Sequence, residues 1–506
     1  MLFRSFFNSI EFVAVFLPVA VAGFFLLAAR RENWLPMAWL VLASLVFYSW
    51  WDYRNLFVIV PSIVGNYLLG WAIGVASAAG RPGRARFLTA AGVAANLAAI
   101  GYFKYFNFAA TALAGATGLD IATHAILLPL GISFFTFQQI KFLVDRHAGV
   151  APQPDPLGYA LLVSFFPHVI AGPIVNYDDL LPQFRKPSFL RFAPDLFADG
   201  VALFLLGLAK KVVLADQFGS YAYEGFSAVA QGHSVTLFAA WGAALAYTLQ
   251  LYFDFSGYSD MAIGLARMFG LHFPLNFNSP YKAQNIIEFW RRWHMTLSRF
   301  LRDYLYIPLG GNRHGPVRRH VNLLLTMLLG GLWHGAAWTF VFWGGLHGVY
   351  LVVNHAWHGL RRMVGRPAGK PSWGGLWLGR GVTLLAVIVG WVFFRADSFA
   401  AAAEMLRGMA GRNGAVLPSQ LIDVVPLLGR LASGLPSVPF SGNGTVLGFV
   451  EMVILLAFGL AITLLAPNLY DISARTRVAL LVPSFAFTLQ KVVFSAGASL
   501  FLYFRF

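Results

Sequence analysis

The sequence predicts an all-α integral membrane protein, and three observations support this fold class. Of the 506 residues, 58% are hydrophobic and only 11% are charged, compared with about 25% charged residues in an ordinary soluble domain. The mean hydropathy is +0.65. The chain also contains about 11–13 stretches that approach the roughly 20 apolar residues needed to cross a bilayer. We therefore expect a single polytopic membrane domain covering residues 1–506.

The apolar runs extend over the whole chain and set the predicted order of the spans. The first run, Met1–Ala29, resembles a secretory signal, but it lacks a clear cleavage site and further spans follow it. We therefore interpret it as a retained first span. The Gly-, Pro- and Ser-rich stretch Gly411–Thr445 is the one long connection expected outside the membrane. The clearest runs begin near residues 10, 35, 56, 87, 125, 157, 196, 235, 321, 381, 447 and 479.

The distribution of basic residues predicts both the class of partner and the orientation of the chain in the membrane. A net charge of +16 suggests nucleic-acid binding in a soluble protein. Here Lys and Arg lie between apolar runs, close to lipid head groups. We therefore expect membrane lipid as a partner and no nucleic acid. Arg30 and Arg31 follow the first run, and Arg81, Arg84 and Arg86 follow the third. Both loops should be cytoplasmic, which places the N-terminus outside.

Two segments depart from simple membrane spans. Prolines and glycines interrupt strongly apolar sequence between residues 126 and 175, which predicts broken helices around an internal cavity. Between Ile286 and Tyr304, aromatic and aliphatic residues recur at three- and four-residue spacing, with charged residues on the opposite face. This second pattern predicts an interfacial or re-entrant helix, although a plain surface helix fits it equally well. The interrupting residues in the first segment are Pro129, Gly131, Pro167, Gly172 and Pro173.

His334 is the strongest candidate for a catalytic residue. Counted from Val321 at about 1.5 Å per residue, it lies about 20 Å along the run, near the middle of a bilayer. Ionisable residues at that depth are costly and are therefore candidates for function. Gly330, Gly331 and Gly335 beside it leave room either for close backbone approach or for a substrate.

His294 is the second candidate. On the predicted 286–304 helix it lies on the border between the aromatic and charged faces, so it points either into a cavity or towards the head groups. Two histidines are suited to moving an acyl group from a thioester to a hydroxyl, because a histidine with a near-neutral pKa takes the hydroxyl proton.

Other kinds of site have weaker support. The chain contains no cysteine, which excludes disulfide bonds, thiolate metal sites and an acyl-cysteine intermediate on this chain. No G-x-S-x-G motif supports serine-based hydrolysis. Asp254 and Asp260 are candidate cation ligands, but without a third carboxylate or a clustered histidine we expect hydrogen bonds between helices. We expect no metal site and no bound cofactor.

Several blocks of sequence resemble the membrane-bound O-acyltransferase (MBOAT) superfamily. The two most specific are NFNSPYKAQNIIEFWRRWHMTLSRFLRDYLYIPL, residues 276–309, and MLLGGLWHGAAWTFVFWGGLHG, residues 327–348. The resemblance is greatest to the bacterial branch typified by the alginate O-acetylation membrane protein, and it extends to about residue 410. Supporting blocks lie at residues 128–138, 166–177, 251–270 and 391–399.

The resemblance implies a ring of membrane helices around a central funnel. In this interpretation residues 1–124 form N-terminal spans, residues 125–400 the core and residues 445–506 C-terminal spans. The family's near-invariant histidine matches His334, and its second polar position matches His294. We assign five further residues to the predicted substrate path, namely Trp293, Trp333, Gly335, Tyr304 and Asp303.

The resemblance also implies a reaction and its partners. Acetyl-CoA is the expected cytoplasmic donor, and acetyl crosses the bacterial inner membrane towards an extracytoplasmic polysaccharide, with alginate as the leading polymer. Cellulose or peptidoglycan acetylation and D-alanyl export to teichoic acid remain alternatives. A periplasmic or membrane-anchored partner of the SGNH type and a polysaccharide synthesis and secretion complex are the expected partners. A transporter or flippase for acyl donors is a rival of another class, and inverted repeats, which would favour it, are not found in the sequence.

Overall fold

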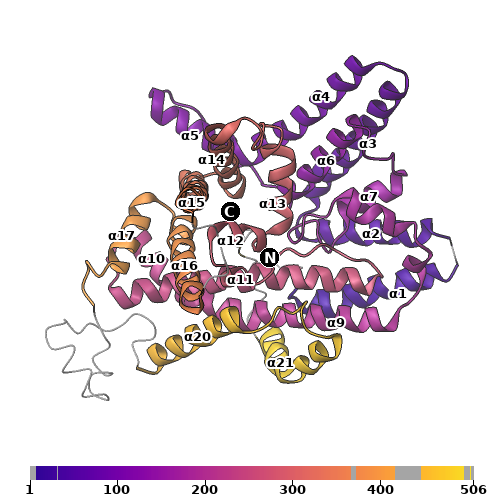
Figure 1. The fold of residues 1–506 in the computed structure, drawn as a ribbon. Helices are drawn as coiled ribbons and strands as arrows, with labels where there is room; N and C mark the ends of the chain where they lie inside the picture. The colour runs from indigo at the N-terminus through magenta and orange to yellow at the C-terminus, as the bar shows by residue number, and fades with distance from the viewer. Residues whose placement is uncertain (1–6, 31, 366–371, 416–445, 495–501, 503–506) are drawn as a thin grey trace. The chain divides into compact units, whose positions relative to one another are not determined.

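The computed structural model describes all residues except 1–6, 31, 366–371, 416–445, 495–501 and 503–506 (Figure 1). Within the described residues the regular structure is helical and no β-strand occurs, which confirms the predicted all-α class. Most of the stretch Gly411–Thr445, expected to be a long connection, lies outside the described residues.

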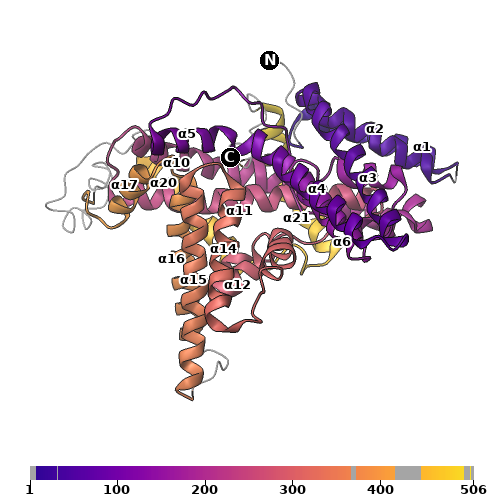
Figure 2. The ribbon, with the colours of Figure 1, turned by 90° about the horizontal axis from the view of Figure 1, so that it is seen from above.

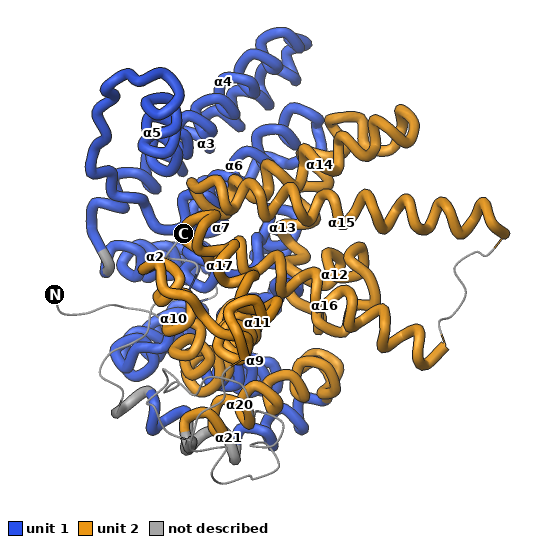
Figure 3. The backbone as a smooth tube through the Cα atoms, turned by 90° about the vertical axis from the view of Figure 1, so that its left-hand side faces the viewer, with its two compact units in different colours: residues 1–209, 256–276, 473–506 blue, residues 210–255, 277–472 orange. Residues whose placement is uncertain are grey.

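The chain divides into two compact units that interleave along the sequence (Figure 3). Unit 1 comprises residues 1–209, 256–276 and 473–506, and unit 2 comprises residues 210–255 and 277–472. Both histidines singled out by the sequence belong to unit 2.

Unit 1 begins with long apolar helices that pack in sequence order. Helix α1 packs against α2, and α3 packs against α4. The α4 helix continues through a π-helical turn, η3, into α5, so that the helical segment from residue 82 to 117 has 36 residues. The bounds are η1 (Phe12–Phe16), α1 (Leu17–Ala28), α2 (Trp34–Trp51), η2 (Tyr53–Asn55), α3 (Leu56–Ala78), α4 (Pro82–Ile100), η3 (Gly101–Tyr105) and α5 (Phe106–Thr117).

The middle of unit 1 contains the broken helices that its prolines and glycines predict. Helix α7 ends at Ser164, and α8 begins only at Tyr177. The irregular segment between them is buried, so its backbone polar groups are shielded from lipid, as irregular backbone in a membrane protein requires. The remaining bounds in this unit are α6 (Ile132–His147), α7 (Pro156–Ser164), α8 (Tyr177–Phe184), η4 (Pro187–Leu190), α9 (Pro194–Ala209) and α21 (Ala474–Phe494).

A buried ion cluster connects three segments of unit 1. Asp199 of α9 accepts a hydrogen bond from Arg477 of α21, with 2.7 Å between Nε and Oδ1. Arg267, on the long helix α11, forms an ion pair with the other carboxylate oxygen of Asp199. Helices α9 and α21 also pack against each other, so this cluster fixes the C-terminal helix to the rest of unit 1.

Unit 2 contains three long helices that lie side by side, α14, α15 and α16 (Figure 2). The backbones of α14 and α15 approach closely because Gly331 and Gly344 face each other, and a Cβ on either would overlap the opposite backbone. The bounds are η5 (Lys210–Ala215), α10 (Asp216–Ala230), α11 (Leu237–Met268, shared with unit 1), η6 (Pro280–Lys282), α12 (Ile286–Arg292), α13 (Met295–Leu301), η7 (Arg302–Tyr306), α14 (Gly315–His334), α15 (Trp338–Met363), α16 (Trp373–Arg395), α17 (Phe399–Met409) and α20 (Val446–Leu465).

The predicted continuous helix over residues 286–304 was wrong. Two short helices, α12 and α13, replace it, with a break at Trp293 and His294. His294 has φ +42°, a left-handed conformation that cannot continue a right-handed helix. The expected border position of His294 between two helical faces is corrected at the same time, because His294 is fully buried.

Four helical segments among the described residues are long and apolar enough to cross a membrane. Two shorter apolar helical segments, Phe12–Ala28 and Trp34–Trp50, accompany them at the N-terminus. The four are Tyr53–Ala78, Pro82–Thr117, Trp373–Arg395 and Gly448–Leu465. The predicted ring and its total number of membrane helices stay predictions.

Candidate functional site

His334 is the last residue of α14. The helix ends here because Gly335 adopts an extended conformation, with φ −160°, and α15 begins at Trp338. The imidazole is buried, with 5% of the residue exposed. Its position at a helix end differs from the predicted position within a continuous span.

A hydrogen bond to the backbone fixes the proton on the His334 ring. Nδ1 lies 2.6 Å from the carbonyl oxygen of Gly330. A carbonyl oxygen only accepts hydrogen bonds, so Nδ1 must carry the proton, and in the neutral ring Nε2 is then the basic nitrogen. The same kind of backbone contact orients histidine bases in known enzymes. His334 is therefore held in the tautomer that a general base needs.

Aromatic side chains surround the His334 ring. Its centroid lies 4.9 Å from that of Trp333, 5.0 Å from that of Trp343 and 5.4 Å from that of Phe394, each in an edge-to-face arrangement. The enclosure limits water and keeps the local dielectric low, which strengthens any electrostatic interaction with a reacting group.

His294 lies between α12 and α13 in a strained conformation. Only His294 and Ser279 among the described non-glycine residues have positive φ. Such strain costs about 1–3 kcal/mol and persists only where the surroundings impose it, typically at functional sites. Burial, followed by the influence of His334, lowers the pKa of His294 well below its ordinary value. The ring is therefore neutral at physiological pH.

The structure brings the two predicted histidines together within unit 2. Trp333 contacts both, with its ring centroid 6.1 Å from that of His294 and 4.9 Å from that of His334. The electrostatic influence of His334 on His294 agrees with this proximity. Phe255 packs on the other side of His294, at 4.8 Å between centroids.

Of the five residues assigned to the substrate path, Trp333 contacts both histidine rings. Trp293 precedes His294 in the chain and is 3% exposed, and its ring packs against Phe277 and Trp391. Gly335 faces the ring of Phe340, and a Cβ there would overlap that ring. This contact favours close packing at Gly335 over an open path.

The other two assigned residues lie on η7, after α13. Asp303 pairs with Arg302, at 2.6 Å between Oδ1 and Nε. Tyr304 stacks on Phe300 at 5.2 Å between centroids. Their place in a substrate path stays a prediction.

Asp254, the alternative metal ligand, forms an ion pair. Its Oδ1 lies 2.6 Å from Nζ of Lys211, which also contacts Asp216 at 2.9 Å. Lys211 belongs to the π-helix η5 and Asp254 to α11, so the pair connects two helical segments, as the prediction of contacts between helices implied.

His347 is a buried residue near the site that the sequence analysis did not single out. It lies on α15 and is fully buried, and its ring is 4.9 Å from Trp343, which also contacts His334. Neither ring nitrogen has a hydrogen-bond partner among the described residues. Its position four residues after Trp343, on the same helical face, was the available signal.

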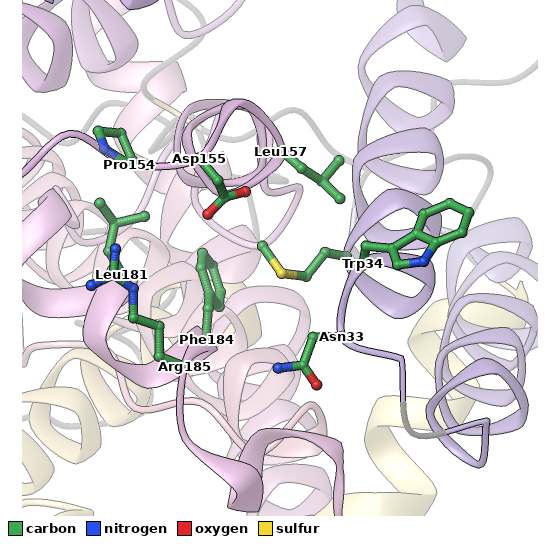
Figure 4. Close-up of a pocket in the computed structure, with 9 residues that line it drawn as sticks. Asn33, Trp34, Pro154, Asp155, Leu157, Leu181, Phe184 and Arg185 are labelled. Carbon is green, nitrogen blue, oxygen red and sulfur yellow. The ribbon is translucent and has the colours of Figure 1, made fainter. Parts of the chain in front are cut away.

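A separate pocket in unit 1 has a different chemistry (Figure 4). It has a volume of about 280 Å³, and its lining combines apolar side chains with the charged Asp155 and Arg185. No histidine lines it. The lining residues are Asn33, Trp34, Met37, Pro154, Asp155, Leu157, Leu181, Phe184 and Arg185. This pocket therefore contains neither of the two candidate histidines.

The helical fold and its long apolar segments are those of a membrane protein, and the comparisons define its family. Residues 146–368 match MBOAT, the membrane-bound O-acyltransferase family. The chain is 38% identical to the peptidoglycan O-acetyltransferase of Helicobacter pylori, in an alignment that covers 99% of this chain and 97% of that protein.

Two further relatives are similar over shorter lengths. The probable alginate O-acetylase AlgI of Pseudomonas aeruginosa is 43% identical, over 80% of this chain and 74% of its own. The teichoic acid D-alanyltransferase of Streptococcus thermophilus is 30% identical, over 49% of this chain and 62% of its own. The chain belongs to the membrane-bound O-acyltransferase family and is an acyltransferase of its bacterial branch.

Proposed function

We propose that this protein takes acetyl from cytoplasmic acetyl-CoA and passes it across the bacterial inner membrane for O-acetylation of an extracytoplasmic polysaccharide. The observation that carries the proposal is the buried His334, whose Nδ1 contacts the Gly330 carbonyl and whose Nε2 is left as the base. His294 is a neutral second imidazole within electrostatic reach.

The proposed chemical step needs no covalent intermediate on this chain. Nε2 of His334 takes the proton of the acceptor hydroxyl, whose oxygen attacks the carbonyl carbon of the acetyl thioester. The new C–O bond forms and the C–S bond breaks. His334 then returns the proton to the departing thiolate, which leaves as CoA. His294 orients one of the reacting groups or relays the proton.

Alginate is the first candidate polymer, because the probable alginate O-acetylase of Pseudomonas aeruginosa is 43% identical to this chain over 80% of its length. Peptidoglycan is the second, and one observation favours it: the peptidoglycan relative aligns with 99% of this chain, including its C-terminal helices. Teichoic acid D-alanylation has less support, because that relative aligns with 49% of the chain.

A gene deletion complemented in the native bacterium tests the function and identifies the polymer. Acetyl content of purified exopolysaccharide and of purified peptidoglycan would be measured separately by NMR. We expect one polymer to lose acetyl in the deletion strain, wild type to restore it and His334→Ala not to restore it. Unchanged acetyl content in both polymers contradicts the proposal, and so does restoration by His334→Ala.

We also propose that the acceptor hydroxyl comes from an SGNH-type partner outside the membrane or from the sugar itself. A polysaccharide synthesis and secretion complex is proposed to surround the enzyme. Crosslinking in native membranes followed by mass spectrometry tests these partners. Thiol release from acetyl-CoA that depends on an added SGNH protein supports a partner acceptor, whereas release with polymer alone supports direct transfer.

The proposed orientation has the N-terminus outside. On this cysteine-free background, Tyr53→Cys lies in an exposed turn expected outside, and Gly83→Cys lies at an open position expected inside. An impermeant thiol reagent should label only Tyr53→Cys in intact cells. Labelling of Gly83→Cys instead would reverse the orientation.

A further inference from the structure

The two non-glycine residues with a left-handed backbone in the described part of the chain, Ser279 and His294, lie in one segment of unit 2. Their φ angles are +45° and +42°. Strained backbone of this kind persists only where the surrounding structure imposes it. We therefore looked for contacts that hold both ends of this segment in place.

Asn278, Glu288 and Arg292 make such contacts, and we name these three residues the clasp. The backbone N–H of Asn278 donates a hydrogen bond to the carbonyl oxygen of Arg292, at 2.9 Å. In return, Nη1 of Arg292 donates to the carbonyl oxygen of Asn278, at 3.1 Å. The two ends of the segment are therefore joined twice, once through the backbone and once through the Arg292 side chain.

Glu288 fixes the guanidinium group of Arg292. Its Oε1 lies 2.8 Å from Nη2 and 2.9 Å from Nε of Arg292. Its other carboxylate oxygen accepts a hydrogen bond from the backbone N–H of Gln284, at 2.9 Å. Charge-assisted hydrogen bonds are roughly twice as strong as neutral ones, so the carboxylate holds the guanidinium in the orientation that reaches the Asn278 carbonyl.

The clasp adjoins both strained residues and the ring of His294. Ser279 directly follows Asn278, and His294 follows Arg292 by two positions. Phe277 directly precedes Asn278, and its ring packs against that of His294 at 6.4 Å between centroids. A shift of the clasp would therefore move the backbone of His294 together with a side chain that contacts its imidazole.

We propose that Arg292 is a positioning residue for acyl transfer, which holds His294 in its left-handed conformation through the clasp. In that conformation the imidazole of His294 lies against Trp333, whose ring also contacts His334. Without the clasp, the backbone of His294 relaxes towards an ordinary negative φ and the imidazole leaves this place. The inference rests on the proposed function, because it assumes that His294 assists the transfer of acetyl.

Arg292→Lys in the full-length protein tests the role of the clasp. Lysine keeps the positive charge but lacks the planar fork that contacts Glu288 and the Asn278 carbonyl together. The side chains of Arg292 and Glu288 are 32% and 25% exposed, so loss of their pairing should change the melting temperature little. We expect kcat for thiol release from acetyl-CoA to fall about threefold to tenfold, with KM for acetyl-CoA unchanged.

A double-mutant cycle with His294→Asn separates positioning from a general structural role. Asn removes the imidazole and tolerates a left-handed backbone. If Arg292 acts through His294, Arg292→Lys should cause no further loss of kcat in the His294→Asn protein. Arg407→Lys, in the exposed ion pair with Glu404 on α17, is the matched control and should keep the wild-type kcat.

Two outcomes of the cycle overturn the proposal. One is full activity of a folded Arg292→Lys variant, and the other is losses that multiply when the two substitutions are combined. If Arg292→Lys does not fold, Glu288→Gln takes its place in the same cycle, because it keeps the shape of the side chain and removes the charge that orients the guanidinium. Its outcomes decide the proposal in the same way.

Failure of the inference and failure of the proposed function remain distinguishable. Thiol release by wild type at a rate that Arg292→Lys leaves unchanged removes the positioning role and keeps the function. Full activity of His294→Asn beside an inactive His334→Ala has the same meaning. Absence of thiol release by wild type contradicts the proposed function, and the inference falls with it.

Discussion

Two buried polar groupings of this protein contrast sharply. In unit 1, Asp199 is paired with Arg267 and Arg477 from two other helices. In unit 2, His294 and His334 are enclosed mainly by aromatic rings, and Trp333 contacts both. Both groupings are largely buried, yet one consists of a carboxylate paired with two arginines and the other of two imidazoles among aromatic rings.

From this difference we expect the Asp199 grouping to serve stability and the histidine grouping to serve catalysis. A buried ion cluster contributes little net stability over apolar packing, but removal of one partner leaves an uncompensated charge and is strongly destabilising. A buried imidazole in a fixed tautomer can exchange protons with a bound substrate. Substitutions in the first grouping should therefore alter stability, and substitutions in the second should alter activity.

The largest effect should come from His334→Ala. We expect it to lower acetyl transfer by about 10²–10⁴-fold, the usual contribution of a general base, because no other ring nitrogen occupies that place. The melting temperature in detergent should stay close to wild type. Polymer acetylation and membrane abundance, measured together, check this, and a fully active variant would remove His334 from the chemistry.

Asp199→Leu should have the converse effect. Loss of the carboxylate breaks the ion pairs with Arg267 and with the buried Arg477, and removal of one partner of a buried ion pair costs about 3–5 kcal/mol. We expect a lower melting temperature and lower abundance, with normal activity per folded molecule. Asp397→Asn is the control, since its side chain is 73% exposed and its 3.6 Å contact with Arg395 is at the surface. Normal stability of Asp199→Leu would contradict the structural role of the cluster.

His294 should be tested with a residue that tolerates its backbone. Asn adopts left-handed conformations more readily than Ala, so His294→Asn removes the imidazole with less strain. We expect a loss of activity of about tenfold, smaller than for His334→Ala, with stability retained. A loss equal to that of His334→Ala would show that the two act as one unit, whereas full activity would leave His294 a packing residue.

Gly335→Leu tests the position directly after His334. A substrate path beside Gly335, as the sequence analysis proposed, would make this variant stable but inactive. Because Gly335 faces the Phe340 ring, we now expect overpacking that costs about 1–3 kcal/mol and lowers the melting temperature along with activity. A variant with wild-type stability and no transfer would restore the substrate path.

The sequence predicted the class of fold because composition and the length of apolar runs depend on the solvent, which here is lipid. It also predicted His334 and His294, since an ionisable residue in apolar sequence is costly. The break at His294 could not be predicted, because a left-handed histidine is imposed by tertiary packing, and the 3.6-residue periodicity continues through it.

Side-chain contacts between residues far apart in the chain likewise could not be predicted from the sequence. Nothing in the spacing of Asp199, Arg267 and Arg477 indicates that α9, α11 and α21 bring them together. The same holds for His347, whose neighbourhood depends on where α15 packs. Pairing across hundreds of residues is a property of the folded chain alone.

The most direct test of the central claim is the rate of CoA thiol release by purified protein in lipid vesicles, supplied with acetyl-CoA, the identified polymer and an added SGNH protein. Wild type and His334→Ala would be compared at equal protein concentration, once their measured melting temperatures had been shown to be the same. We predict steady thiol release by wild type and, for His334→Ala, a rate lower by about 10²-fold or more. Equal rates from the two proteins would contradict the assignment of His334 as the base.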